Sequence, residues 1–259
     1  MQAPHSDWLV PDWPAPANVR ALFSTRNGGV CAKPYDSLNL GLHVGDEAEH
    51  VAHNRSVLQA HIGKRAVFLN QVHGHEVIHV DSHTPDALAA DGAFTDQIGI
   101  ACTVMVADCL PVLLCDAAGQ KVAAAHAGWR GLLGVQGYGV LEHTVAAMGL
   151  PVQQSSGALL AWLGPCIGPT AFEVGDEVRT AFASVTPAAA ECFSPLPGGK
   201  WLANLPRLAQ QRLSALGIAR TYGNDGGQEW CTVSNPSRFF SHRRDRISGR
   251  MAACIWLVD

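Results

Sequence analysis

The stretch GIACTVMVADCLPVLLCDAAGQKVAAAHAGWRG, residues 99–131, decides the fold. It contains three apolar runs of strand length, at 99–106, 110–116 and 121–126, separated by short turns. Runs this short and this rich in Val, Ile and Leu are typical of buried β-strands. The stretch therefore predicts consecutive strands joined by tight turns, which is the centre of a mixed sheet.

Further elements are expected on both sides of this stretch. Asn204 can cap a helix whose leucines fall on one face and which ends at Gly217. Because strands joined by tight turns alternate irregularly with helices, the sequence predicts an α+β fold: a single domain over 1–259, with mixed β-sheets layered with helices. The other expected strands are 66–72, 76–80, 159–163 and 251–258, and the expected helices are about 131–148, 172–183 and 205–216.

Composition and charge narrow the class of protein. The formal charge of −4 and the scattered Lys and Arg residues argue against nucleic acid as a partner. No secretory signal or membrane-length apolar run is found, so no membrane contact is expected. The eight cysteines show no disulfide framework and no CxxC motif. We expect a cytoplasmic protein with reduced thiols and, because no heptad pattern is present, a monomer.

Three residues with metal-binding side chains each lie at the end of a strand-like run. They are His73 in NQVHGH, Cys109 in VADCLPVLLC and His126 in AAAHAGWRG. Taken singly, each can equally be a packed or a surface residue. Together, two imidazoles and one thiolate make a zinc site with three protein ligands and a fourth position open for water or substrate. The spacing predicts a catalytic metal site rather than a closed structural one.

Other nucleotide-related templates do not match. The chain has no Walker loop and no GxGxxG after a strand, which argues against a nucleoside triphosphatase and a Rossmann domain. The zinc deaminase signature needs His-x-Glu and Pro-Cys-x-x-Cys. Here His75 is followed directly by Glu76, and Cys166 has no second Cys three residues on. A cytidine-deaminase fold is therefore excluded, although zinc-assisted deamination is not.

Eight motifs in chain order resemble one known family. This is the bacterial laccase-domain family, called multicopper polyphenol oxidase-like and also described as purine nucleoside phosphorylases with adenosine deaminase activity. The resemblance covers residues 23–257 and leaves the first twenty or so residues unassigned. The motifs are STRNGGV (24–30), LNLGLHVGD (38–46), NQVHG (70–74), ADGAFT (90–95), ADCLPVLL (107–114), HAGWRG (126–131), GPCIGP (164–169) and FFSHRRD (239–245).

The resemblance implies a site, a cofactor and a reaction. His73, Cys109 and His126 match the family's metal-binding and catalytic residues, with Zn²⁺ as the cofactor and Cu²⁺ as a substitute. The implied substrates are phosphate and the purine nucleosides adenosine, inosine and methylthioadenosine, which give a free base and a ribose 1-phosphate; adenosine would also be deaminated. The implied fold resembles that of putative cysteine hydrolases. Where the family usually has Tyr, this chain has His242.

Substrate contacts are expected from five polar residues. Arg26, and Arg243 or Arg244, can hold a phosphate dianion through charge-assisted hydrogen bonds. Asn39 and Gln71 can bind a nucleoside because an amide both donates and accepts hydrogen bonds. Each has a structural alternative: an arginine in a turn is often solvated or part of a surface ion pair, and Asn39 can cap a turn.

Other functions remain open at this point. A cysteine hydrolase would use Cys109 as the nucleophile and His126 as the base, and would cleave an amino-acid-linked sugar nucleotide in peptidoglycan synthesis. A copper-dependent polyphenol oxidase (laccase) has less support, because reduction of dioxygen needs several coppers and one three-ligand site does not hold them. A binding module without catalysis is the fourth alternative.

Overall fold

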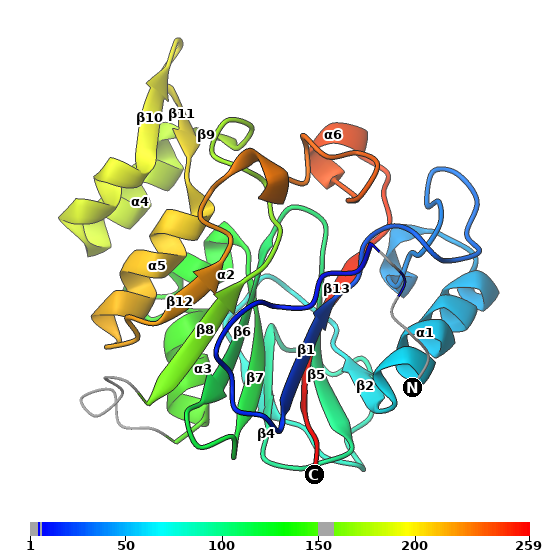
Figure 1. Cartoon of the computed structure of the whole chain (residues 1–259). Helices are drawn as coiled ribbons and strands as arrows, with labels where there is room; N and C mark the ends of the chain where they lie inside the picture. The colour runs from blue at the N-terminus through cyan, green and yellow to red at the C-terminus, as the bar shows by residue number, and fades with distance from the viewer. Residues whose placement is uncertain (1–4, 6, 150–157) are drawn as a thin grey trace.

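Two mixed β-sheets packed face to face form the centre of the molecule (Figure 1). The structure is a computed structural model and describes residues 5, 7–149 and 158–259. The four-stranded sheet has the order β1 (Val19–Phe23), β13 (Met251–Leu257), β5 (Ile100–Val106), β2 (Arg65–Phe68). The six-stranded sheet has the order β12 (Thr221–Gly223), β8 (Leu159–Leu163), β6 (Leu110–Asp116), β7 (Val122–Ala127), β4 (Gly92–Thr95), β3 (Val77–His79).

Both sheets are mixed, as the tight turns of the central stretch predict. β2 runs parallel to β5, and the other pairs of the four-stranded sheet are antiparallel. The outer pairs of the six-stranded sheet are parallel and its central pairs antiparallel. A third, antiparallel sheet stands apart, in the order β10 (Phe193–Leu196), β11 (Lys200–Ala203), β9 (Glu173–Gly175).

Helices cover the outer faces of the two main sheets. α1 (Ala48–Ile62) packs on the four-stranded sheet. α3 (Val140–Ala147), α4 (Asp176–Val185) and α5 (Leu205–Ala215) share the apolar cluster on the outer face of the six-stranded sheet. The described residues also form the short helices α2 (Trp129–Leu133) and α6 (His242–Asp245), and the 3₁₀ turns η1 (Leu42–Val44), η3 (Pro187–Cys192) and η4 (Gln228–Trp230).

This layering explains why the central strands are apolar throughout. Along β6, Val112 and Leu114 face the helices, whereas Leu113 and Cys115 face the other sheet. Successive side chains of a strand point to opposite faces, and here both faces are covered. A continuous apolar run is therefore what this position requires.

The structure confirms the central strands and corrects several other elements. The strand expected at 66–72 ends at Phe68. The helix expected at 131–148 is two helices, because the segment between α2 and α3 has a left-handed backbone at Gly134, Gln136 and Gly137. The helix expected at 172–183 begins only at Asp176, because the residues before it form β9 and pair with β11.

One rim of the molecule collects the loops that carry chemistry. β5 ends at Val106 opposite Met251, where β13 begins, and β6 begins at Leu110 opposite Ala127, where β7 ends. The segments that follow or precede these residues therefore emerge at the same end of both sheets, where α6 also lies at the top of Figure 1.

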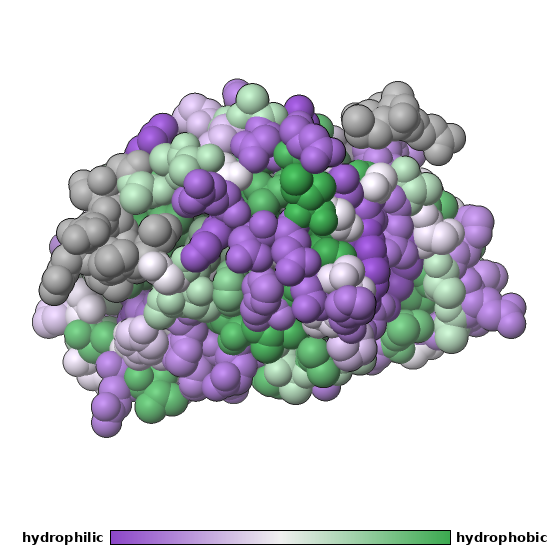
Figure 2. Space-filling view, turned by 90° about the horizontal axis from the view of Figure 1, so that it is seen from below, coloured by the Kyte–Doolittle hydropathy of each residue, from purple (hydrophilic) through white to green (hydrophobic). Residues whose placement is uncertain are grey.

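Figure 2 shows the opposite end of the molecule. The face in Figure 2 carries mainly hydrophilic side chains, with apolar residues in several separate places. Within the described ranges, no helix combines the length and apolar composition that crossing a membrane requires.

Candidate metal centre

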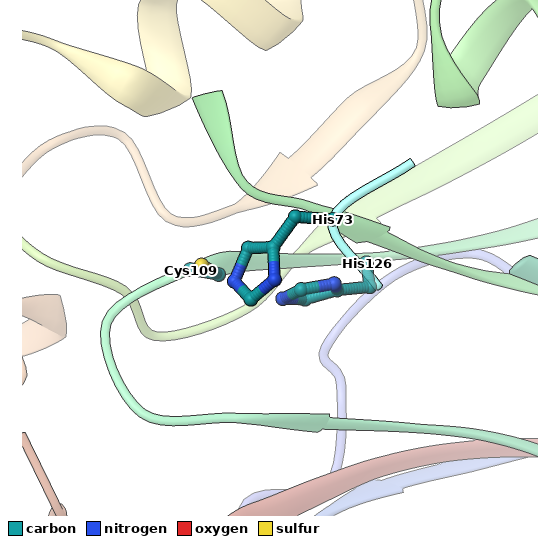
Figure 3. A group of neighbouring side chains, drawn as sticks. All are labelled: His73, Cys109 and His126. Atoms are coloured by element: carbon teal, nitrogen blue, oxygen red, sulfur yellow. The ribbon is translucent and has the colours of Figure 1, made fainter. Parts of the chain in front are cut away.

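The three predicted ligand residues lie together at this rim. His73, Cys109 and His126 each offer a ligand atom, and these atoms all lie within 4.8 Å of one another. Figure 3 shows the three side chains converging from different segments. The tertiary structure thus brings together side chains that are up to 53 positions apart in the sequence.

Strand register places Cys109 beside His126. Leu110 of β6 pairs with Ala127 of β7, and Pro111 pairs with His126. Cys109 directly precedes β6, so its side chain emerges where β7 ends. Antiparallel pairing fixes the separation of the two residues, because hydrogen-bonded strands lie about 4.8 Å apart.

One buried carboxylate holds the two histidines. Asp91 is fully buried, and its Oδ1 lies 2.8 Å from Nδ1 of His126. The same carboxylate accepts hydrogen bonds from the backbone N–H groups of Val72 at 3.2 Å, His73 at 2.9 Å and Gly74 at 2.7 Å. His73 has a φ of 60°, a left-handed conformation that a residue other than glycine keeps only when its surroundings hold it. Asp91 therefore leaves Nε2 of His126 free for a ligand and fixes the His73 loop.

Asp108 fixes the backbone on the other side of the site. Its φ is 94°, and its carboxylate accepts hydrogen bonds from Oγ1 of Thr232 and from the backbone N–H of Arg243, both at 2.6 Å. Its carbonyl accepts one from the N–H of Ile167 at 2.8 Å. These contacts hold a strained residue directly before Cys109.

Gly128 leaves space for two of the three candidate ligand residues, Cys109 and His73. A Cβ at this position would lie 3.0 Å from Sγ of Cys109 and 3.1 Å from Cδ2 of His73. Gly131 is equally constrained, because a Cβ there would lie 2.5 Å from the carbonyl oxygen of Gly74. The glycines of HAGWRG thus permit the close approach that the sequence suggests.

Charges within the site favour a thiolate next to an imidazolium. Burial opposes ionisation of the Cys109 thiol. The positive charges of His126 and His73, and the hydrogen bonds that both form with the sulfur, outweigh burial and lower the pKa of the thiol to about 6. Burial likewise opposes protonation of His126, but the Cys109 thiolate and Asp91 raise the pKa of the imidazole to about 9. A reactive or metal-binding cysteine needs this electropositive setting.

The donor set fits a metal ion. Tetrahedral zinc with bonds of about 2.0 to 2.3 Å separates its ligand atoms by roughly 3.5 Å, and small side-chain rotations bring atoms within 4.8 Å to that separation. Asp91 supplies the carboxylate that metal-bound histidines usually have. Among the residues that the structure describes, this is the one group of three or more such side chains close enough to share an ion.

A cavity of about 400 Å³ opens over the three ligand residues, a volume in the range of small-molecule sites. One wall is apolar and consists of Ile167, Phe172 and Leu205, which belong to the core cluster of the six-stranded sheet. Polar and cationic side chains, including His43 and Arg250, also line the cavity. Arg250 directly precedes β13 of the four-stranded sheet, so it lies at the other side of the rim from this apolar cluster. The cavity is therefore two-ended: one end is apolar and the other is polar and cationic.

Two of the five expected substrate-binding residues line this cavity. Gln71 does so with its amide already engaged, because Nε2 donates to the carbonyl of Met105 at 2.8 Å and Oε1 accepts from the N–H of Met105 at 2.7 Å. Arg243 also lines it, and its Nη1 donates to the carbonyl of Glu173 at 3.0 Å.

The other three are not among the residues that line it. The guanidinium of Arg26 binds the carbonyls of Asp36 and Pro236, pairs with the Asp36 carboxylate at 3.3 Å and covers the ring of Phe240. Arg244 similarly binds carbonyl oxygens and the carboxylate of Asp245. Both arginines therefore stabilise contacts between loops.

Asn39 supports the site from behind. It is fully buried, and its Oδ1 accepts hydrogen bonds from the N–H groups of Gly41 and Arg250, both at 2.9 Å. Turn formation, the structural alternative for Asn39, is thus what the structure shows. Its contact with Arg250 nevertheless links it to the cavity.

The sequence analysis missed several residues of the site. Asp91 lies within the quoted motif ADGAFT, but nothing in that motif singles it out as the partner of His126. Trp129 and Arg130 follow His126 in HAGWRG and line the cavity. Arg250 lies beyond the last quoted motif, and only the pairing of β13 with β5 places it at the rim.

Comparison with known proteins finds relatives that match almost the whole chain. Residues 20–258 match the family described as multi-copper polyphenol oxidoreductase laccase. A purine nucleoside phosphorylase of Pseudomonas aeruginosa is 49% identical over 253 residues, covering 97% of this chain and 99% of that protein. The purine nucleoside phosphorylase YfiH of Escherichia coli is 47% identical over 255 residues, covering 98% of this chain and all of that protein.

Solved structures show the same fold. A Neisseria meningitidis protein superposes with a TM-score of 0.88 at 48% identity, covering 98% of this chain and 100% of that one. YlmD from Geobacillus stearothermophilus superposes with a TM-score of 0.87 at 29% identity, covering 100% of this chain and 98% of that one.

Proposed function

We infer that this chain, which belongs to the multi-copper polyphenol oxidoreductase laccase family, is a metal-dependent purine nucleoside phosphorylase. Relatives between 43% and 49% identical over almost their whole length are named purine nucleoside phosphorylase. The observation that carries the proposal is the two-ended cavity, in which an apolar wall and arginines border the metal-ligating residues.

The cavity has the groups that phosphorolysis requires. An oxygen of HPO₄²⁻ forms a bond to C1′ of the ribose, while the bond from C1′ to the purine nitrogen breaks and its electron pair leaves with the base. The proton of the phosphate ends on the purine, so that free base and ribose 1-phosphate balance the equation. The protein must hold the dianion, fix the nucleoside and exclude water.

Different residues of the cavity are suited to binding the phosphate and to binding the purine. Arg130, Arg243 and Arg250 line the cavity, and none of them has a carboxylate within 4.0 Å in the described part of the chain. Their charges are therefore free to bind an anion. Trp129 and Phe172 offer flat apolar surfaces for a purine ring.

Two finer assignments concern the identity of the metal ion and a second reaction, the deamination of adenosine. We propose zinc as the resident ion, with copper as a substitute, held by His73, Cys109 and His126; when bound, the ion supplies Lewis-acid chemistry next to the nucleoside. We further propose that adenosine is deaminated at C6 in the same cavity. Two imidazoles and a thiolate, with one side open to the cavity, support both assignments.

A product assay tests the function. Zinc-loaded protein is incubated with adenosine, inosine or methylthioadenosine, with and without phosphate, and the products are separated by chromatography. We expect free base and ribose 1-phosphate (methylthioribose 1-phosphate from methylthioadenosine) only when phosphate is present, and inosine from adenosine without it. A His73→Ala protein should lose both zinc and activity, because two ligands hold the ion poorly against water. Equal base release with and without phosphate would identify a hydrolase instead.

A second candidate is a cysteine hydrolase. The observation that favours it is the Cys109–His126–Asp91 arrangement, in which a low-pKa thiol lies beside an imidazole that a carboxylate orients. Its substrate would be an amino-acid-linked sugar nucleotide. The two functions separate on metal: a fully active metal-free preparation supports the hydrolase, whereas activity that returns with zinc supports the phosphorylase.

The polyphenol oxidase alternative has less support, and the cellular location and oligomeric state are assigned on more general grounds. A polyphenol oxidase needs several coppers, whereas the described residues supply the one three-ligand group. We also propose a cytoplasmic monomer that acts on small molecules, supported by eight free thiols. Size-exclusion chromatography with light scattering tests the monomer.

A further inference from the structure

We propose that Arg250 anchors the phosphate-binding end of the cavity, so that phosphate enters at Arg250 and the purine at the opposite, apolar wall. This inference rests on the proposed function and deepens it. It assigns the role that the sequence analysis gave to Arg26, whose guanidinium is engaged elsewhere.

Arg250 is held by contacts that leave part of its guanidinium free. Its backbone N–H donates to Oδ1 of Asn39 at 2.9 Å. Its Nη1 donates to the carbonyls of Ser248 and Gly249, both at 3.0 Å. Its Cγ packs over Gly41, where a Cβ would lie only 2.8 Å away. The stem and one end of the side chain are therefore fixed before any ligand arrives.

The other side of the guanidinium has no protein acceptor. Among the described residues, no hydrogen bond is formed by Nε or Nη2 of Arg250, and no carboxylate lies within 4.0 Å of it. Nε and Nη2 form the edge of the guanidinium that binds two oxygens of a phosphate at once. A preorganised arginine with this edge free, in the wall of a cavity, is a built anion site.

The other two cavity arginines are less suited to this role. Arg130 is exposed, and its guanidinium lies over the ring of Trp129 at 4.3 Å. Arg243 already donates through Nη1 to the carbonyl of Glu173 and lies beside the ring of Phe172. Both therefore belong to the aromatic end, where the base is expected.

The position of Arg250 sets the direction in which substrates bind. It directly precedes β13, and Met251 pairs with Val106 at the end of β5. Ile167, Phe172 and Leu205 belong instead to the apolar cluster over the six-stranded sheet. Phosphate at Arg250 and purine at this apolar wall leave the ribose between them, next to the metal-ligating residues, where C1′ must be attacked.

A dianion with this chemistry has two sources, free inorganic phosphate and the 5′-phosphate of a nucleotide. We assign inorganic phosphate, because the proposed reaction needs a phosphate that is not already attached to ribose. Adenosine 5′-monophosphate is the probe for the other source.

The test compares Arg250→Gln and Arg250→Lys with Arg246→Gln, an exposed arginine four positions earlier that does not line the cavity. Inorganic phosphate and adenosine 5′-monophosphate are titrated calorimetrically into each zinc-loaded protein, and KM values for phosphate and for inosine are measured separately. For Arg250→Gln we expect phosphate affinity to fall, and the phosphate KM to rise, by about ten- to a hundredfold. The KM for inosine should stay nearly constant. Arg250→Lys should recover part of the phosphate affinity, because lysine keeps the positive charge but lacks the planar, forked set of donors of a guanidinium.

Several outcomes overturn the proposal. Unchanged phosphate affinity in Arg250→Gln removes Arg250 from the phosphate site, and so does an equal rise in both KM values. Arg250-dependent binding of the nucleotide alone assigns the site to a 5′-phosphate. If Arg250→Gln does not fold, Arg250→Lys gives the same comparison. A wild-type protein that binds phosphate through Arg250 but catalyses no phosphorolysis refutes the proposed function and leaves this inference standing.

Discussion

At the scale of single residues, Asp91 organises the candidate metal centre. It contacts His126 through a side chain and His73 through a backbone N–H, so one buried carboxylate positions two of the three ligand residues. Burial opposes its ionisation, but the hydrogen bond from His126 and those from the backbone outweigh burial and lower the pKa of Asp91. A carboxylate in this position is expected to affect metal binding without touching the metal.

Asp91→Asn should therefore weaken zinc binding. The amide keeps the size of the side chain but loses the charge and one acceptor, and loss of such a partner typically costs about ten- to a hundredfold in metal affinity. Zinc affinity is measured by competition with a chromophoric chelator. The matched control is Asp96→Asn, because Asp96 pairs with His79 at 3.1 Å on the exposed surface. Similar affinities for both variants would contradict the role of Asp91.

Cys109 differs from the other thiols in its ionisation. Its pKa of about 6 contrasts with Cys102 and Cys254, whose pKa burial raises far above neutral. The thiolate is the form that both binds metal and attacks an electrophile. Reaction with an alkylating reagent therefore distinguishes a bound from a free thiolate.

In metal-free protein, iodoacetamide should modify Cys109 first. Because the pKa is lowered, the thiolate fraction rises between about pH 5 and pH 7 and is nearly complete at neutrality, where an ordinary thiol is still protonated. Peptide mass spectrometry across this pH range gives the rate at each cysteine. Zinc should protect Cys109; equally fast alkylation of the zinc-loaded protein would show that Cys109 is not a ligand.

At the scale of elements, α5 connects helix formation to the cavity. Asn204 caps the helix by accepting a hydrogen bond from the N–H of Arg207 at 3.0 Å, and Pro206 lies in the first turn, where its missing N–H costs nothing. Leu205, the first residue of α5, lines the cavity. The start of this helix thus sets part of the apolar wall.

Asn204→Ala should destabilise the protein by about 1 kcal/mol, the usual cost of losing an N-terminal cap. For a chain of this size the expected fall in Tm is about 2 to 4 °C, which differential scanning calorimetry resolves. Asn204→Asp keeps the acceptor oxygen and should stay close to wild type. A fall of the same size in both variants would mean that Asn204 acts through packing rather than through the cap.

At the scale of the whole molecule, a buried ion pair ties helices together over the six-stranded sheet. Nε of Arg212 in α5 lies 2.8 Å from Oε1 of Glu142 in α3, and both side chains are about nine-tenths buried. Glu142 also accepts from the N–H of Gly139, and Arg212 donates to the carbonyl of Gly137. The pair therefore fixes the loop between α2 and α3 as well as the two helices.

Arg212→Met should lower the free energy of unfolding by about 3 to 5 kcal/mol, because it leaves the charge of Glu142 buried without a partner. Glu142→Gln together with Arg212→Met removes that charge and should recover much of the loss. Urea unfolding measures both. The exposed pair Arg207–Glu191 at 3.1 Å provides the control, since Arg207→Met should cost less than about 1 kcal/mol. Equal costs at the two sites would contradict the importance of burial.

Local patterns predicted most of the central elements. The strands in residues 99–131 and the capped helix at 205–216 were recognisable because apolar periodicity, short turns and caps are properties of neighbouring residues. The two short helices in place of one at 131–148 were not, because glycines in the middle of an apolar segment are compatible with either reading. β9 was missed because its three residues are a strand only when paired with β11.

The sequence by itself determined the α+β class, the central strands and the three candidate ligand residues, because side-chain chemistry and local periodicity are written in the order of the residues. Only the tertiary structure decided that Asp91 holds His126, that Arg26 is engaged at Asp36, and that Arg250 lies free in the wall of the cavity. These facts depend on strand register and on contacts between distant segments. A hydrogen bond or an open guanidinium edge is a property of positions in space, and no local pattern carries it.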